Sequence, residues 1–383
     1  MKLLILGGTH FAGRAIVEAA LADGIELTML NRGNTTIPGL SGKPVRTLIA
    51  DRTDPDALRA ALGDQEWDAV IDTWSWAPSV VAASCELLKG RTGHYGYVST
   101  LSVYADPIPQ DAKEDAPTVA ADPDDDQDWT DGAGYQRVKR GSELAVLRTF
   151  GDGALLARAG LILGPYENVG RLPWWLRRIE RGGKVLAPDG PDVPVQYVDV
   201  RDLARWMLDM AKRRAGGAFN VVNKSGETTL GQFLSTAIAV TGSDAELVWV
   251  PEQVILDAKL EPWTELPLWM PRDWDEPVDV SAAFAAGLTG RTAQETVTDT
   301  WAWLQAEGDP QPRRQPGLPP EKEQAVLAQF RSILLRAILL RADPVTRGSC
   351  YGQSCYGRIL LRSADLAGSR MRGWRRLRII RIG

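Results

Sequence analysis

Short apolar runs alternate with helix-like segments over the first 160 residues, and this alternation restricts the fold more than any other feature of the sequence. The runs are continuously apolar, as expected for strands that are buried on both faces. Strands that alternate with helices imply a parallel sheet with helices on both sides. We therefore predict an α/β protein with a doubly wound parallel sheet. The expected strands cover residues 2–6, 25–30, 45–50, 68–72, 95–99 and 154–159, and the expected helices cover 12–22, 55–62, 78–89 and 134–150.

A glycine-bearing turn joins the first expected strand to the first expected helix. The segment reads LLILGGTHFAG from Leu3 to Gly13. Such a turn places backbone N–H groups and the positive end of the helix dipole against a pyrophosphate. Its position between strand and helix predicts a Rossmann-type dinucleotide site, with a plain turn as the alternative. The candidate cofactor-binding residues of this turn are Gly7, Thr9, His10, Phe11 and Gly13.

The strand and helix pattern loosens after residue 165. We expect residues 1–165 to form the dinucleotide-binding domain and residues 195–225 to return to it. Residues 166–194 and 226–330 then form a smaller C-terminal α/β part that binds the substrate. Within this part, residues 263–274 (WTELPLWMPRDW) are rich in tryptophan and proline. They either wall the substrate pocket or form a loop that is pinned to the core.

Residues 331–383 differ sharply in composition from the rest of the chain. They contain 12 Arg and 2 Asp and carry a charge of +10, whereas the preceding residues carry −15. The acidic main body shows no footprint for nucleic acid, so no such partner is expected for it. Because the domain pattern is complete by Phe330, we predict a tail that is disordered or non-native, as a shifted reading frame would give. A basic arm for nucleic acid or an anionic membrane is the rival interpretation.

Cysteine and histidine are scarce in this chain. Cys85, Cys350 and Cys355 are too few for a disulfide framework, and the last two lack the CxxC spacing. With His10 and His94 as the only histidines, we expect neither a histidine-based metal centre nor a Ser-His-Asp triad. No apolar run reaches the roughly 18 residues of a membrane span, and the N-terminal run is shorter than a signal-peptide core. We therefore expect a cytoplasmic protein without a membrane partner, and a homodimer stays open.

The clearest catalytic pattern is the pair Tyr135 and Lys139. The two residues stand at i and i+4 in an expected helix and therefore share one face. An ammonium group close to a phenol favours the phenolate, which exchanges a proton with a substrate hydroxyl or carbonyl near neutral pH. A hydroxyl from the segment STLSVY (Ser99–Tyr104) can bond the same substrate oxygen while a nicotinamide gives or takes the hydride. A YxxxK pair alone is common, but its position after the glycine turn and this strand favours a catalytic role.

Taken together, these motifs resemble the extended short-chain dehydrogenase/reductases, the NAD-dependent epimerase/dehydratase family. Within that family the chain is most similar to the branch with a GGTxFxG loop and NRG after the second strand. The extended pattern TGxxGxxG is changed at two positions, where Leu6 replaces Thr and His10 replaces the middle Gly. The resemblance covers about residues 1–210, and family-like features continue to about residue 330. The matching segments are GGTHFAG (Gly7–Gly13), NRG (Asn31–Gly33), DR (Asp51-Arg52), STLSVY (Ser99–Tyr104), YQRVK (Tyr135–Lys139), GLILGP (Gly160–Pro165) and VDVRDLA (Val198–Ala204).

The resemblance implies a role for each catalytic candidate. Tyr135 is the expected acid/base, and Lys139 is its activator and a ligand of the cofactor ribose. Thr100 lies four residues before Tyr104, where the family carries its Ser or Thr, and is the expected third catalytic hydroxyl. Ser99 is the fallback and a further cofactor-binding candidate. Plant chloroplast RNA-binding relatives resemble the loop but have lost the catalytic Tyr and Lys, so their presence here favours an enzyme.

Absent motifs narrow the expected reaction. Nucleotide-sugar 4,6-dehydratases carry Asp-Glu after the catalytic Thr, but this chain has Leu101-Ser102. Many nucleotide-sugar members carry an arginine where Pro194, Val195 and Gln196 stand here. We therefore predict an NAD(P)-dependent oxidoreductase that reduces a carbonyl or oxidises a secondary alcohol of a small polar metabolite. The alternatives are a sugar-type epimerase with a transient keto intermediate and a non-catalytic NAD(P)-binding regulatory protein.

The acidic run Asp122–Asp128 either selects a cationic substrate or is a solvated loop.

Residues after the second and third expected strands bear on the choice of cofactor. NAD enzymes usually place an acidic residue after the second strand to hold the ribose hydroxyls. Asn31 does not repel a 2′-phosphate and Arg32 can pair with one, so NADP is preferred over NAD, although this segment can also be a solvated turn. Asp51 and Arg52 are placed to line the adenine pocket, with a surface turn as the alternative.

Overall fold

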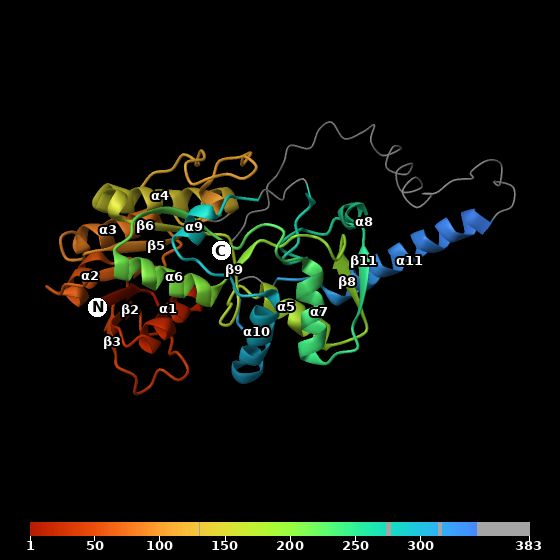
Figure 1. Ribbon diagram of the computed structural model, residues 1–383, viewed down its shortest axis with the longest axis horizontal. Coiled ribbons are helices and arrows are strands. Elements are labelled where there is room, and N and C mark those ends of the chain that lie inside the picture. Colours follow the sequence, from red (N-terminus) through yellow and green to blue (C-terminus); the bar gives the residue numbers. More distant parts are fainter. Residues whose placement is uncertain (130, 273–276, 313–315, 343–383) are drawn as a thin grey trace. The chain divides into compact units, whose positions relative to one another are not determined.

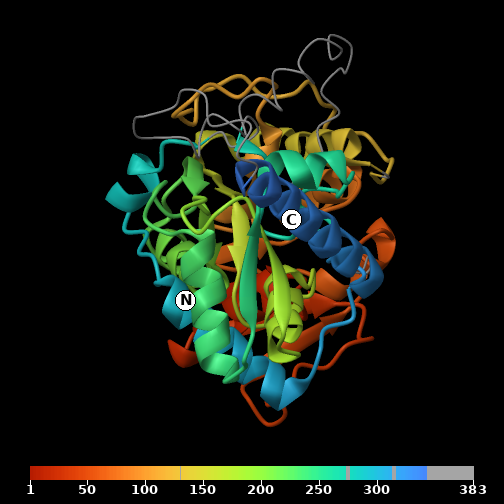
Figure 2. The same ribbon diagram turned by 90° about the vertical axis from the view of Figure 1, so that its right-hand side faces the viewer.

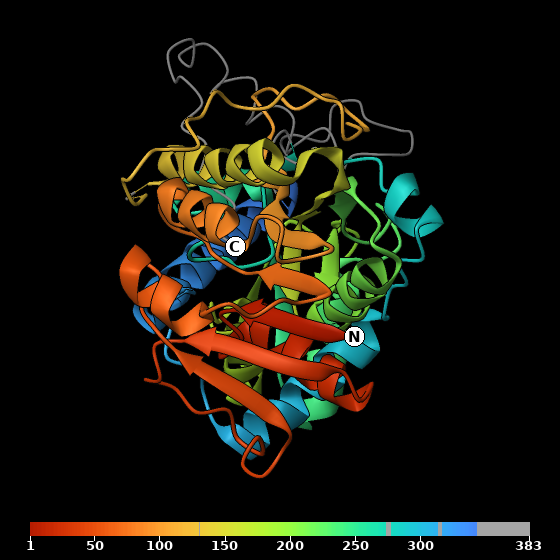
Figure 3. The same ribbon diagram turned by 90° about the vertical axis from the view of Figure 1, so that its left-hand side faces the viewer.

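A seven-stranded parallel sheet forms the centre of the computed structural model, which describes residues 1–129, 131–272, 277–312 and 316–342. The strand order is β10-β6-β5-β4-β1-β2-β3, and Figure 3 shows the edge that carries β1 to β3. The chain reverses its direction of progress across the sheet between β1 and β4. In such sheets ligands bind at the carboxyl ends of the strands beside this reversal. The predicted doubly wound, Rossmann-type fold is confirmed. The strands are β1 (Lys2–Leu6), β2 (Glu26–Asn31), β3 (Val45–Ile49), β4 (Ala69–Asp72), β5 (Tyr95–Thr100), β6 (Leu155–Ala159) and β10 (Gly217–Val221).

Alternating side chains of the sheet build a core on each face. In β1, Leu3 and Ile5 belong to the apolar cluster with α1 and α6, whereas Leu4 and Leu6 belong to the cluster with α2, α3 and α4. Both sets of helices are visible in Figure 1. Because both faces of β1 are covered, its sequence is apolar at every position from Leu3 to Leu6. The helices are α1 (Phe11–Ala22), α2 (Pro55–Leu62), α3 (Pro78–Leu88), α4 (Gly132–Phe150) and α6 (Val200–Arg213).

A smaller α/β part follows the sheet within the same compact unit, which extends to Pro319. Strands β8 and β11 pair in parallel, and helices α5, α7 and α10 pack against one another. Figure 2 turns this part toward the viewer. A second short parallel pair, β7 with β9, lies outside the central sheet. The elements are β7 (Leu161–Leu163), α5 (Arg171–Glu180), β8 (Lys184–Pro188), β9 (Tyr197–Asp199), α7 (Leu230–Thr241), β11 (Glu246–Val250), α8 (Glu252–Asp257), α9 (Ser281–Ala285) and α10 (Ala293–Glu307).

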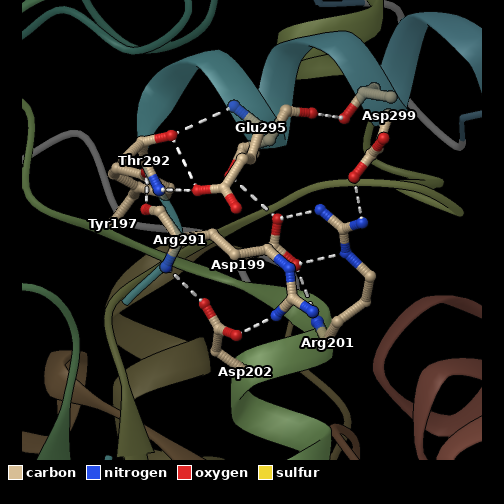
Figure 4. Close-up of polar contacts among 10 residues, drawn as sticks. Tyr197, Asp199, Arg201, Asp202, Arg291, Thr292, Glu295 and Asp299 are labelled. Carbon is tan, nitrogen blue, oxygen red and sulfur yellow. Dashed lines mark hydrogen bonds and ion pairs between the residues drawn. The ribbon is translucent and has the colours of Figure 1, made fainter. Parts of the chain in front are cut away.

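A polar cluster joins α6 to α10 (Figure 4). Asp199 caps α6 by accepting a hydrogen bond from the Arg201 backbone N–H at 2.9 Å, and it also accepts one from the Thr296 hydroxyl of α10 at 2.8 Å. Arg291, just before α10, pairs with Asp202 of α6. Burial raises the pKa of Asp202 to about 6, although Arg291 opposes this. The cluster therefore ties a helix that covers the central sheet to a helix of the smaller part.

The structure differs from the sequence-based expectation in two elements. The apolar segment 195–200 predicts a strand from the sequence, but the observed strand is only β9 (Tyr197–Asp199), which pairs with β7. The sequence predicts a final helix over residues 321–329. The observed helix is α11 (Pro320–Ala342), and it belongs to a second compact unit that begins at Pro320. The first 12 residues of the expected tail are therefore helical, and residues 343–383 lie outside the described residues.

Candidate active site

The turn after β1 has the geometry of a pyrophosphate cradle. Gly7 and Gly8 have φ values of +112° and +97°, which only glycine adopts without strain. A Cβ atom on Gly7 would lie 2.3 Å from the Thr73 hydroxyl oxygen, and one on Gly13 would lie 2.8 Å from the Gly8 nitrogen. Gly8 was not among the residues expected from the sequence, although the doubled glycine of GGTHFAG was the available signal.

The N-terminus of α1 leaves its first backbone donors to a ligand. His10 is the N-cap residue, and its side chain makes no capping hydrogen bond. His10 is exposed, Thr9 is half-buried, and Phe11 is buried with a φ of +36°. Uncapped N–H groups and the helix dipole together suit an anionic group. The residues present therefore fit the diphosphate of a dinucleotide.

The end of β2 presents one exposed cation. The Asn31 side-chain oxygen accepts a hydrogen bond from the Gly33 N–H at 2.7 Å, which fixes the turn. Arg32 is exposed, and its charge lowers the pKa of His10 in addition to the larger effect of burial. Arg32 also adds to the lowering of the pKa of Asp51, whose main cause is hydrogen bonding from Thr53. Arg32 thus lies close enough to both His10 and Asp51 to lower the pKa of each.

Arg52 is buried and does not lie in the exposed surface turn that was the alternative to an adenine-lining position. Its guanidinium is buried and donates to both Asp72 carboxylate oxygens at 2.6 and 2.8 Å and to the Ser84 hydroxyl at 2.8 Å. Burial alone would raise the pKa of Asp72, but the charge and hydrogen bonds of Arg52 lower it below its usual value. Arg52 therefore supports the end of β4 from inside, and its role at the adenine stays a prediction. Asp51 is exposed and accepts from the Thr53 N–H at 2.9 Å.

Lys139 is buried in the core, where it contacts the segment after β4 and the strand β5. Its ammonium donates to the backbone carbonyls of Trp74 at 2.9 Å and Val98 at 2.6 Å, and it lies 4.3 Å from the centre of the Tyr97 ring. Burial lowers its pKa to about 7, while Asp72 and Glu143 oppose this. An ammonium has three donors. Two are bound to carbonyls, so one is left for a ligand.

Tyr135 lies one helical turn before Lys139 on α4 and is also buried, with 3% of its surface exposed. Its ring meets the Trp129 ring edge-on at 5.4 Å, and Trp129 stacks on Trp76 at 5.3 Å. The Trp129 indole N–H donates to the Ser75 carbonyl at 3.0 Å. Sequence reasoning missed this aromatic wall, although the WSW segment after β4 (Trp74–Trp76) was a visible signal.

Thr100 and Ser99 point to opposite sides of β5, as neighbouring strand residues must. The Ser99 hydroxyl donates to the buried Glu143 carboxylate at 2.6 Å, and Glu143 pairs with Arg158. The Thr100 hydroxyl instead lies 3.3 Å from the Ser102 hydroxyl and accepts from the Ser102 N–H. Of the two residues, Thr100 is the one directed to the carboxyl end of β5. The segment that follows β5 there packs against α4.

A hollow opens beside this end of the sheet. It encloses about 630 Å³, counting space that is open to solvent. Leu101 follows Thr100 directly, and Gly160 follows β6, so the hollow begins where β5 and β6 end. Its lining also includes residues 193–196 and the tryptophan-rich segment, with Trp263, Leu268, Met270 and Arg272. The pocket-wall interpretation of that segment thereby gains support over a simple pinned loop.

The acidic run before α4 is held by local contacts. The Asp128 carboxylate accepts from the Ala77 N–H at 2.9 Å, and Asp124 pairs with Arg148 at 2.7 Å. Asp122 and Asp125 each accept a backbone N–H two residues further on. These contacts favour the loop interpretation over selection of a cationic substrate.

Within the described ranges, no group of three or more His, Cys, Asp or Glu side chains is arranged to hold a metal ion.

The sheet order, the glycine turn and the Tyr135–Lys139 pair define a dinucleotide-binding protein of the extended short-chain dehydrogenase/reductase type. The chain belongs to the NAD dependent epimerase/dehydratase family, whose model matches residues 3–223. The predicted class, NAD-dependent enzymes of the extended type, is thereby confirmed. None of the described helices is both long enough and apolar enough to cross a bilayer.

Known proteins similar to this chain include a plant protein and several bacterial enzymes. Chloroplast stem-loop binding protein of 41 kDa b from Arabidopsis thaliana is 26% identical over 239 residues, which is 59% of this chain and 59% of that protein. Bordetella bronchiseptica WbmH, in complex with NAD+, superposes with a TM-score of 0.61 at 18% identity, covering 80% of this chain and 99% of WbmH. A UDP-glucose 4-epimerase gives a TM-score of 0.61 at 14% identity, covering 81% of this chain and 99% of the epimerase. Bordetella bronchiseptica WbmG, in complex with NAD and UDP, gives 0.59 at 17% identity, covering 81% of this chain and 95% of WbmG.

Proposed function

We propose that the chain is an NAD(P)-dependent oxidoreductase that reduces a carbonyl, or oxidises a secondary alcohol, of a small polar metabolite. The observation that carries this proposal is the placement of Lys139. Its buried ammonium is anchored by two backbone carbonyls, with one donor left over and Tyr135 one turn away on the same helix. A binding protein would have no need of a cation in so costly a position.

In this proposal Tyr135 exchanges a proton with the substrate oxygen and Lys139 favours its phenolate form. Thr100 donates a hydrogen bond to the same oxygen, which fixes the reacting carbon. When bound, the dinucleotide would supply or accept the hydride. Lys139 would use its remaining donor on the ribose.

We further propose NADP as the preferred cofactor. Asn31 ends β2 without a negative charge, and the adjacent Arg32 is exposed. A guanidinium suits phosphate oxygens because it offers a planar fork of donors. The similar solved structures contain NAD rather than NADP, so the preference of this chain has to be measured.

The test is turnover of NADPH and NADH with a panel of small aldehydes and ketones. A reductase consumes the reduced cofactor in proportion to product. An epimerase, which the similarity to UDP-glucose 4-epimerase keeps as the second candidate, interconverts isomers without net consumption. Absence of both activities in a protein that binds the cofactor would contradict the proposal and favour the regulatory alternative.

A further inference from the structure

The first residue of α5 is a buried cation that the mechanism above does not use. Arg171 has 4% of its surface exposed. Its guanidinium lies over the Trp263 ring, 4.9 Å from the centre. Among the described residues, none forms a hydrogen bond or an ion pair with this guanidinium.

Arg171 contacts a residue that lines the hollow, and it lies close enough to Tyr135 to be influenced by it electrostatically. Trp263, which it covers, lines the hollow that begins at Leu101, the residue after Thr100. Burial lowers the pKa of Arg171, whereas the nearby Glu167 and Tyr135 raise it. A substrate in the hollow with its reacting oxygen at Tyr135 would therefore have Arg171 within its reach.

The neighbouring carboxylate does not satisfy the guanidinium. Glu167 is fully buried, and its two oxygens accept from the backbone N–H groups of Arg171 and Leu172 at 2.8 and 3.1 Å. Glu167 thus occupies the N-terminus of α5, the part of a helix that otherwise receives an anionic ligand. A buried cation without an acceptor is costly, and such a group calls for an explanation.

We propose that Arg171 binds a carboxylate of the substrate, which makes the substrate a small hydroxy or oxo acid. This inference rests on the proposed oxidoreductase function and adds the substrate class. Arg171 is a specificity-determining residue of the same site, and Trp263 supports the flat face of its guanidinium.

The surroundings favour a carboxylate over a phosphate ester. The backbone donors of the α5 N-terminus, which would hold phosphate oxygens, are already taken by Glu167. One guanidinium matches the charge and the two coplanar oxygens of one carboxylate. A dianionic phosphate would leave one negative charge unpaired beside the single guanidinium in a buried position, which is costly. The same occupation of α5 disfavours a nucleoside diphosphate.

The test compares wild type with Arg171→Gln on matched substrates: short 2-oxo and 3-oxo acids, their primary amides, and phosphate esters of small hydroxyketones. Loss of a charge-assisted hydrogen bond corresponds to about a 10- to 100-fold loss of kcat/KM. We expect that loss for the acids, less than about threefold change for the amides, and poor use of the phosphate esters by wild type. Arg177→Gln is the matched control, because Arg177 lies on the same helix but pairs with Glu180 and Asp309. Arg177→Gln should leave kcat/KM unchanged for every substrate.

A second measurement keeps the inference separate from the proposed function. Tryptophan fluorescence, followed with the oxo acids and amides as probes, reports binding without turnover. Because the chain contains 14 tryptophans, the same titration of Trp263→Phe identifies the part of the signal that arises at Trp263. Acid binding that is lost in Arg171→Gln but not in Arg177→Gln supports the inference even if no substrate is reduced. If Arg171→Gln does not fold, Arg171→Lys, which keeps the charge but not the fork, should still weaken acid binding. Equal use of acids and amides by wild type, or preference for the phosphate esters, would overturn the inference while leaving the oxidoreductase proposal intact.

Discussion

Lys139 shows how one residue links the core to the chemistry. Its contacts to the carbonyls of Trp74 and Val98 join the ends of β4 and β5, so the same side chain braces the sheet and, in the proposed mechanism, carries the catalytic charge. Replacing Lys139 by alanine would remove a buried donor from the carbonyls of Trp74 and Val98, although the Trp74 carbonyl would keep the Tyr97 hydroxyl as a donor. We expect it to cost stability as well as activity. Tyr135 is therefore the cleaner residue on which to test catalysis.

Tyr135→Phe should keep the fold and the cofactor affinity, because only one hydroxyl is lost. Turnover should fall by roughly 10²- to 10⁴-fold, the usual contribution of a positioned acid/base. Steady-state kinetics together with cofactor titration and melting curves would measure the three effects separately. Near-normal turnover in a folded Tyr135→Phe protein would show that another group moves the proton.

Arg32→Ala tests the cofactor preference at the end of β2. If Arg32 pairs with the 2′-phosphate, NADPH affinity should fall about 10- to 100-fold and NADH affinity should stay unchanged. Arg46→Ala is the matched control, since Arg46 is an exposed arginine of the neighbouring strand β3 that bonds Gln65. An equal loss for both cofactors would place Arg32 along the adenine instead, and a wild-type preference for NADH would reject the NADP assignment.

At the scale of elements, the central sheet was predictable because its strands are buried on both faces. The runs from Lys2 to Ala159 coincide with the observed strands to within a residue or so. The length of the strand expected at 195–200 was overestimated. Val195 is apolar because its side chain lines the hollow, and only residues 197–199 pair with β7. The last helix was underestimated, because the change to arginine and leucine was taken as its end although neither proline nor glycine interrupts residues 331–342.

The candidate site could be proposed from its residue types, but the directions of its side chains could not be predicted. Tyr135 and Lys139 are candidates because of their spacing along a helix, and Thr100 is a candidate because of the family resemblance. The partners of Lys139 are backbone carbonyls, which no sequence pattern marks. Arg52 pairs with Asp72, whereas no acceptor for the Arg171 guanidinium is found among the described residues. That difference depends on which strand or helix brings a carboxylate within reach.

The N-terminus of α5 makes a prediction about pH. Burial raises the pKa of Glu167 to about 7 from its usual 4.5, and Arg171 only partly opposes this. Between these two values the folded state binds more protons than the unfolded state, so this group lowers stability as the pH rises through that window. Full ionisation in the folded state costs on the order of 3 kcal/mol.

Glu167→Gln keeps an oxygen for the backbone donors but removes the ionisation. The Tm of the variant relative to wild type should therefore increase from pH 5 to pH 8. Thermal melts at the two values measure this, with Glu180→Gln on the exposed end of the same helix as the control. A Tm difference that is constant or falls with pH would mean that Glu167 is stabilised as a carboxylate by Arg171.

At the scale of the whole molecule, charge and architecture divide the chain at nearly the same place. Residues 1–330 carry −15 and the remainder +10, and the first compact unit ends at Pro319. Every residue to which a catalytic or cofactor role is assigned lies within that first unit. Since α11 continues to Ala342, a cut after Phe330 would interrupt a helix, and a cut after Ala342 is the better test of the tail.

Deleting residues 343–383 removes nine arginines and two aspartates and leaves a chain with a net charge of −12. We expect unchanged Tm, cofactor affinity and turnover, because no assigned site residue is lost. The rival is a basic arm, whose binding to an anionic polymer would fall steeply with salt as counterions are released. The measurement is binding of full-length and shortened protein to a labelled RNA stem-loop and to anionic vesicles at two salt concentrations. Salt-sensitive binding by the full-length chain alone would establish the arm, whereas loss of stability or cofactor affinity on truncation would show that the tail supports the enzyme itself.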